Sequence, residues 1–190
     1  MAKGGASENE TCRELSKWWS YGESRAMFAR TQMSGGKATI RSRKKKSTPY
    51  EYGDITFSDP RGQPLIDFFL LENKSGYKDT INILDFIDSP NKHPQLLKWW
   101  VKAEQEKELA GRYFSLLIFR RTRKSKCVMM TSELFNLCES FSGDWNQSKP
   151  ILDVAIEKYY WIVISFNNFL DWVSPDSIIA IKNHKDKGEE

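Results

Sequence analysis

The feature that most constrains the fold of this chain is a largely apolar run, residues 66–71, that ends abruptly in Glu72-Asn73-Lys74. A run of this length, rich in aromatic and branched side chains, predicts a buried strand. We expect this strand to span residues 65–72. The change from apolar to charged side chains predicts that polar groups gather where the strand emerges from the core.

A second short strand is predicted for residues 54–58, directly after Gly53. The segment between the two strands, SDPRGQP, contains Pro60 and Gly62, which are typical turn residues. The sequence therefore predicts that the two strands pair as a hairpin. In such a hairpin Asp54 would lie near the end of the strand from which Glu72 emerges.

Charged side chains would then converge at one end of the sheet. Because side chains alternate across a strand, Glu72 and Lys74 point to one face while Asn73 points to the other. The carboxylates of Asp54 and Glu72 would repel each other unless a cation lies between them. Hard oxygen ligands of this kind suit Mg²⁺, and the Asn73 carbonyl could supply a third ligand. Lys74 could hold a scissile phosphate, and a metal-bound water would be the nucleophile.

A simpler interpretation of the same residues stays open at this point. Asp54 and Glu72 could be exposed residues at strand ends, with Lys74 as an ion-pair partner, because acidic residues and lysines are common on surfaces. The catalytic interpretation is favoured by the position of Glu72 and Lys74, which follow directly from a buried strand.

The remaining segments alternate between predicted helices and strands. Thr11, with Glu14 three residues later, predicts a capped helix that ends near Gly22. A second helix is closed by Gly111, and a last short helix is expected at residues 167–173. Further strands are expected at residues 25–31, 113–120, 126–131 and 159–165, of which 113–120 and 126–131 pair as a hairpin. This alternation predicts an α/β domain with a mixed sheet covered by helices.

Size and composition indicate the broad class of protein. The 190 residues, 39% hydrophobic and 28% charged, are expected to form one domain, with a core over residues 11–131 and an extension over 132–190 that packs on it. We expect no secretory signal and no membrane span, because no apolar run is long enough. The scattered cysteines, Cys12, Cys127 and Cys138, argue against a zinc module and indicate a reducing cytoplasm.

Basic residues gather between Glu23 and Glu51, a stretch that contains no acidic residue. Such a charge run can be a solvated loop, or it can bind a polyanion, because clustered Lys and Arg displace counterions from a phosphate backbone. The run leads directly to Asp54, so it is tethered beside the predicted metal site. We name as the basic arm the residues Lys37, Arg41, Arg43, Lys44, Lys45 and Lys46.

The order of these motifs resembles that of a known family. Gly53-Asp54 followed by Glu72-Asn73-Lys74 resembles the core of the PD-(D/E)xK nucleases, with GD in place of the more usual PD. Glu14, Arg30 and the Ser34-Gly35-Gly36 turn precede it, as in archaeal-type and phage-encoded Holliday-junction resolvases. The similarity covers roughly residues 12–121.

The resemblance implies a restriction-endonuclease-like core of helix–strand–strand–strand–helix–strand. It also implies Mg²⁺-dependent hydrolysis of phosphodiester bonds in branched DNA, with Mn²⁺ as a substitute ion, by a homodimer in the host-cell cytoplasm. It assigns catalysis to Glu14, Asp54, Glu72 and Lys74, and metal binding to Glu14, Asp54 and Glu72. Asn73 joins the predicted metal ligands from its position on the strand. Contacts to the DNA backbone would come from Arg30, Ser34 and the basic arm.

Two choices stay open, and one prediction concerns the dimer. The helix after the ExK motif often contributes a polar group in this family, and Lys98, Lys102 and Gln105 share one helical face. The adjacent Trp99 and Trp100 predict that one ring is free for a dimer contact, because only one face of a helix enters its own core. A restriction-like or repair endonuclease on the same fold, or a non-catalytic DNA-binding phage protein, is the alternative function.

Overall fold

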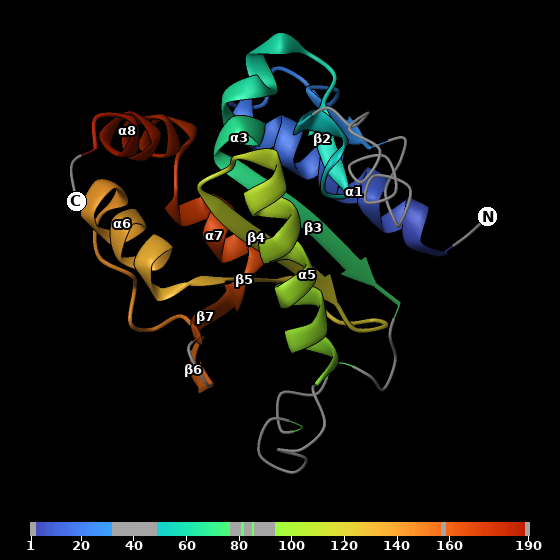
Figure 1. The fold of residues 1–190 in the computed structure, drawn as a ribbon, viewed down its shortest axis with the longest axis vertical. Coiled ribbons are helices and arrows are strands. Elements are labelled where there is room, and N and C mark those ends of the chain that lie inside the picture. The colour runs from blue at the N-terminus through green and yellow to red at the C-terminus, as the bar shows by residue number, and fades with distance from the viewer. Residues whose placement is uncertain are drawn as a thin grey trace.

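The structure is a computed structural model that describes residues 3–31, 49–76, 81, 85, 94–156 and 159–188. Helices and strands alternate along the chain (Figure 1). The helices are α1 (Lys3–Trp19), α3 (Gln63–Phe68), α5 (Gln95–Ala110), α6 (Ser132–Ser142), α7 (Phe166–Trp172) and α8 (Pro175–Asp186), with 3₁₀ turns η1 (Pro49–Glu51) and η2 (Pro60–Gly62). The strands are β1 (Phe28–Arg30), β2 (Ile55–Phe57), β3 (Phe69–Ser75), β4 (Phe114–Arg120), β5 (Cys127–Thr131), β6 (Ile151–Ile156) and β7 (Tyr159–Ser165).

The central sheet has five strands in the order β3-β4-β5-β7-β6. β3 and β4 run parallel, with Ser75 opposite Arg120 at the end of the pair. The other neighbours in this sheet are antiparallel, and β1 and β2 form a separate antiparallel pair. This mixed sheet with flanking helices confirms the predicted α/β fold class and is consistent with a restriction-endonuclease-like core.

Helices cover both faces of the central sheet. On one face α5 packs through Trp100 beside Leu117 of β4. On the other face α1, α3, α6, α7 and α8 share one cluster of buried side chains with the strands, from Leu15 in α1 to Ile181 in α8. Leu71 of β3 belongs to this second cluster. The alternation of side chains along β3 therefore turns Glu72 and Lys74 toward α5 and Asn73 toward α1.

The predicted hairpin of residues 54–58 and 65–72 is wrong. Residues 63–68 form the helix α3, and the strand that carries Glu72 begins only at Phe69 and pairs with β4. β2 pairs with β1 instead. An apolar run that is buried on all sides shows neither the period of a strand nor that of a helix, so the pattern does not separate the two structures. Pro64 in the first turn of α3 is, however, a signal for the start of a helix.

The predicted cap of the first helix is also wrong. α1 begins at Lys3, so Thr11 and Glu14 lie inside it. The hydroxyl of Thr11 lies 3.0 Å from the carbonyl oxygen of Ser7, which is a bond within the helix. Residues 6–10 include alanine and two glutamates, which are strong helix formers, so the helix extends past the expected start.

The prediction for the two adjacent tryptophans is wrong as well. Trp99 and Trp100 are both buried, with 7% and 0% of their surface exposed. α5 is enclosed on more than one side, because Ile81 joins the same cluster as the sheet residues. Neither ring is therefore free for a dimer contact.

Several local predictions are confirmed. α5 ends at Gly111, which adopts φ +66°, and β4 pairs with β5 as the expected hairpin. The sequence interpretation missed α6, α8 and β6, although Thr131 and Ser174 cap the two helices with their side chains. No helix of the described residues is long and apolar enough to cross a membrane.

Candidate active site

Asp54 is held against β3 by a tight turn that precedes β2. Gly53 adopts φ +76°, and a Cβ atom there would lie 2.9 Å from the carbonyl oxygen of Leu71. The backbone N–H of Asp54 donates to the same oxygen over 2.9 Å. This close approach requires glycine, because any side chain would meet the backbone of β3.

The structure brings together the three side chains on which the catalytic interpretation depends. Lys74 Nζ lies 2.8 Å from Asp54 Oδ2 and 2.5 Å from Glu72 Oε1. The backbone N–H of Asn73 donates to Asp54 Oδ2 over 2.9 Å. Asp54 is 5% exposed and Glu72 is fully buried. They are therefore not exposed strand-end residues, although Lys74 is their ion-pair partner, as the simpler interpretation also predicted.

Burial makes the charges of this group depend on one another. Burial raises the pKa of Glu72, and the negative charge of Asp54 raises it further. The positive charges of Lys74 and Lys102 act in the opposite direction. Burial disfavours the charged form of Lys74, but the carboxylates of Glu72 and Asp54 outweigh it and raise the pKa of that ammonium above its usual value. A further cation at Glu72 would favour the ionised carboxylate.

The helix α5 supplies a second lysine to this group. Lys102 Nζ lies 3.2 Å from Glu72 Oε1 and 3.0 Å from Glu106 Oε1. Lys98 and Gln105, the other two candidates, are exposed. Of the three alternatives, Lys102 is the one that contacts Glu72, and its role in the site stays a prediction.

Two residues that the sequence interpretation missed hold the turn around Gly53. Glu106 Oε2 accepts the N–H of Gly53 over 3.3 Å. The buried guanidinium of Arg112 donates to the carbonyl oxygens of Tyr52 and Phe69 over 3.5 and 3.2 Å, and burial lowers its pKa to about 10. The only signal in the sequence was the spacing of Lys102 and Glu106, which puts both on one face of α5.

The donor set fits a cation at Asp54 and Glu72. The carboxylates of Asp54 and Glu72 share Lys74, and Lys102 bridges Glu72 and Glu106. Glu72 Oε2 is buried and has no hydrogen-bond partner in the described part of the chain. A buried carboxylate oxygen without a partner is costly unless a cation or donor binds it. No three His, Cys, Asp or Glu side chains among the described residues lie close enough together to hold a metal by themselves.

Glu14 and the side chain of Asn73 lie elsewhere. Glu14 is on α1, which covers the opposite face of the sheet from Glu72, and its carboxylate accepts from Lys126. The Asn73 side-chain oxygen accepts from the hydroxyl of Thr11 over 2.9 Å on the α1 side. The assignment of Glu14 and Asn73 as metal ligands stays a prediction.

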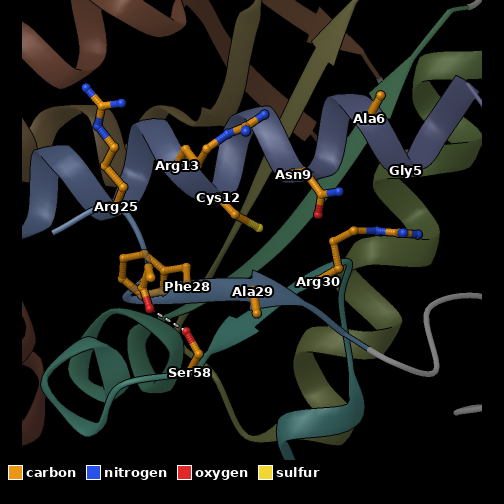
Figure 2. A pocket seen from close by; sticks show the side chains of 11 residues that line it. Gly5, Ala6, Asn9, Cys12, Arg13, Arg25, Phe28, Ala29, Arg30 and Ser58 are labelled. Atoms are coloured by element: carbon orange, nitrogen blue, oxygen red, sulfur yellow. Dashed lines mark hydrogen bonds between the residues drawn. The ribbon is translucent and has the colours of Figure 1, made fainter.

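A cavity of about 670 Å³ lies between α1 and β1 (Figure 2). Arg13 and Arg25 on its rim are exposed and have no side-chain partner among the described residues. Arg30, which was predicted to contact DNA, pairs with Glu8. In the pair of β1 and β2, Arg30 lies opposite Ile55, the residue that follows Asp54. Cys12 points into the cavity (Figure 2), and burial raises the pKa of its thiol to about 12.

The other predicted DNA contacts, Ser34 and the basic arm, lie outside the described residues. Their placement relative to the cavity and to Asp54 therefore stays a prediction. The segment that contains them joins Thr31 to Pro49. The N–H of Thr31 donates to the carbonyl oxygen of Asp54 over 3.0 Å, so the segment starts beside the acidic residues.

The comparison with protein families agrees with this arrangement. A family model described as "Phage putative PDDEXK endonuclease" matches residues 1–180. No curated protein and no solved structure gives a significant match. Because the family match covers nearly the whole length of the sequence, this chain belongs to the phage putative PDDEXK endonuclease family.

Proposed function

We propose that this protein is a Mg²⁺-dependent endodeoxyribonuclease that hydrolyses phosphodiester bonds in branched DNA and acts as a homodimer in the cytoplasm of the phage host. Membership of the family supports an endonuclease. The observation that carries the chemistry is the convergence of Asp54, Glu72 and Lys74 at the carboxyl end of β3, with Glu72 Oε2 buried and unpartnered among the described residues.

The proposed metal ligands are Asp54 and Glu72. A carbonyl of Asn73 is a further candidate from its position on the strand, and the carboxylate of Glu14, which pairs with Lys126 here, is one from the resemblance alone. When bound, Mg²⁺, or Mn²⁺ in its place, would polarise a phosphoryl oxygen and make a bound water a stronger nucleophile at neutral pH.

The other residues would act on the substrate and on the site itself. Lys74, held by both carboxylates, is placed to contact a phosphate oxygen and stabilise charge that develops on it. Lys102 keeps a second positive charge at Glu72, and Glu106 keeps Gly53, and with it Asp54, in place. Arg30 and the basic arm would hold the phosphate backbone beside the site without reading its sequence.

The decisive experiment is a cleavage assay on four-way, flap and linear duplex DNA, with and without Mg²⁺. We expect Mg²⁺-dependent cutting with a preference for the four-way junction. Asp54→Asn and Glu72→Gln should abolish cutting, because each removes a charged ligand while keeping the shape of the side chain. Lys74→Ala should slow turnover by roughly 100-fold or more, as for the loss of one preorganised donor.

DNA binding without metal is the control measurement, and Asp144→Asn is the control variant, since Asp144 is an exposed carboxylate between α6 and β6 that lines neither cavity. Binding should stay close to that of the parent in the Asp54, Glu72 and Asp144 variants, and Lys74→Ala should lose at most the contribution of one phosphate contact. Asp144→Asn should cut normally. Undiminished cutting by Asp54→Asn would refute the proposed site. Equal cutting of linear and branched duplexes would favour a restriction-like or repair endonuclease.

A further inference from the structure

The turn between β4 and β5 carries a dense group of basic residues that the proposed site does not use. The segment RRTRKSK, residues 120–126, has five basic side chains in seven positions. The chain has no acidic residue between Glu108 and Glu133. From the sequence, this segment is predicted only to connect the two strands of a hairpin.

The structure places this turn beside the candidate active site. Arg120, the last residue of β4, lies opposite Ser75 of β3, and Lys74 is one position earlier on the same strand. An open cavity of about 380 Å³ is lined by Ser75 and Gly76 together with the turn. Figure 1 shows the turn next to the tip of the β3 arrow. The turn therefore lies at the end of β3 that carries Lys74.

The basic side chains of the segment fall into two groups. Arg120 and Lys126, at its ends, pair with Glu10 of α1, and Lys126 pairs also with Glu14. The middle group, Arg121, Arg123 and Lys124, is exposed and has no side-chain partner in the parts of the chain that the structure describes. We name these three residues the basic turn. The acidic side chains of α1 thus fix the base of the hairpin and leave three positive charges for an outside partner.

A backbone hydrogen bond closes the basic turn. The N–H of Lys124 donates to the carbonyl oxygen of Arg121 over 3.1 Å. Arg123 adopts φ +62°, a left-handed conformation that is unusual for a residue with a side chain. Charges on a short anchored turn lose less conformational freedom on binding than charges on a long flexible segment. This surface is therefore suited to a contact of fixed register with a polyanion.

We propose that the basic turn binds the phosphate backbone of the DNA substrate on the β4 side of the active site. This inference rests on the proposed function for the identity of the polyanion. Arg30 of β1 lies opposite Ile55, the residue after Asp54, and the basic turn lines a cavity with Ser75, the residue after Lys74. Basic residues therefore lie close to both segments that carry the acidic residues. Such contacts position the duplex and carry no sequence information.

The test measures DNA binding apart from cleavage. Arg121, Arg123 and Lys124 are replaced together by glutamine in the full-length chain. Binding of a labelled duplex DNA is followed by anisotropy over a salt series in EDTA. The steepness of log K against log salt should fall by about 0.9 for each phosphate group that the variant no longer binds. For one to three lost contacts this is a decrease of about 1 to about 3. Affinity at low salt should fall at least about tenfold.

A matched control removes three positive charges elsewhere, with Lys17, Lys149 and Lys187 replaced by glutamine. None of the three lines either cavity, so the slope should change much less. Circular dichroism shows whether each variant is folded, and the single variants Arg121→Gln and Lys124→Gln replace the triple variant if it is not.

The outcomes separate this inference from the proposed function. A salt slope equal to that of the parent would overturn the role of the basic turn, and so would a loss of affinity for duplex RNA without a loss for duplex DNA. If the parent cuts no DNA but the triple variant still binds DNA more weakly and with a smaller slope, the proposed cleavage fails while the basic turn stands as a DNA-binding surface.

Discussion

Gly53 shows how one residue decides the geometry of the candidate site. Its φ of +76° and the 2.9 Å distance from its missing Cβ to the Leu71 carbonyl oxygen place two separate demands on this position. The first is conformational and applies to any glycine with positive φ. The second is the close passage of the turn over β3, which brings Asp54 to Lys74.

We predict that Gly53→Ala destabilises the protein more than Gly111→Ala does. Gly111 also has positive φ, +66°, in the left-handed region, but no atom lies within 4 Å of a Cβ built there. Both variants should suffer the conformational penalty of about 1–2 kcal/mol for a side chain at positive φ. Only Gly53→Ala adds a clash, which we expect to lower the free energy of unfolding by about 1–3 kcal/mol more. Urea unfolding measures the difference, and equal destabilisation would contradict this account of the turn.

At the scale of elements, α5 supports the active site from the side opposite to α1. Its Lys102 reaches Glu72, and its Glu106 reaches both Lys102 and the N–H of Gly53. One face of a helix thereby connects the strand that carries Glu72 with the turn that carries Asp54. The separation of Lys102 and Glu106 by four residues makes this possible.

The role of Glu106 predicts different effects for two substitutions. Glu106→Ala leaves the N–H of Gly53 without its acceptor, which should lower the free energy of unfolding by about 1–3 kcal/mol and slow cleavage. Glu106→Gln keeps an acceptor oxygen and should lose less stability. Urea unfolding and the rate of junction cleavage test this. Equal effects of the two substitutions would show that the bond to Gly53 does not hold Asp54.

The basic arm is a second element whose role is open to a direct test. Replacing Arg43, Lys44, Lys45 and Lys46 by glutamine should weaken DNA binding and reduce its salt slope by about 0.9 for each phosphate group released. Thermal unfolding should be unchanged if the arm contributes nothing to the core. A salt slope and an affinity equal to those of the parent would mean that the arm is only a solvated loop.

At the scale of the whole molecule, the proposed dimer needs an association surface other than Trp99 and Trp100, which are buried. Exposed apolar side chains gather on β6 and β7 instead: Ile151 is 42% exposed, Leu152 40% and Tyr160 63%. β6 is an edge strand of the central sheet, and unpaired strand edges are ready surfaces for association.

We predict a dimer at micromolar concentration in sedimentation velocity, both alone and with four-way junction DNA. Two sites related by a two-fold axis would match two cuts in one junction, and a specific interface would bury about 1,200–2,000 Å² in total. Leu152→Lys should shift the equilibrium toward monomer if the β6 edge forms the interface. A parent protein that is monomeric in both conditions would weaken the junction-resolving function and favour a nicking enzyme.

The sequence by itself determined the features that depend on neighbours along the chain. The alternation of side chains put Glu72 and Lys74 on one face of β3 whatever strand lies beside it. Gly111 ended α5 because a left-handed residue there terminates a helix. The order of the GD and ExK motifs was enough to predict that Asp54, Glu72 and Lys74 lie close together, as they do.

The tertiary structure decided the features that depend on residues far apart in sequence. Asp54 reaches Lys74 because β2 docks on β3 through the Leu71 carbonyl, and the predicted hairpin does not exist. Three residues share one face of α5, and only the packing of α5 against β3 shows that Lys102 is the one that contacts Glu72. Spacing reports which side chains share a face, but the partner of that face depends on how the elements pack.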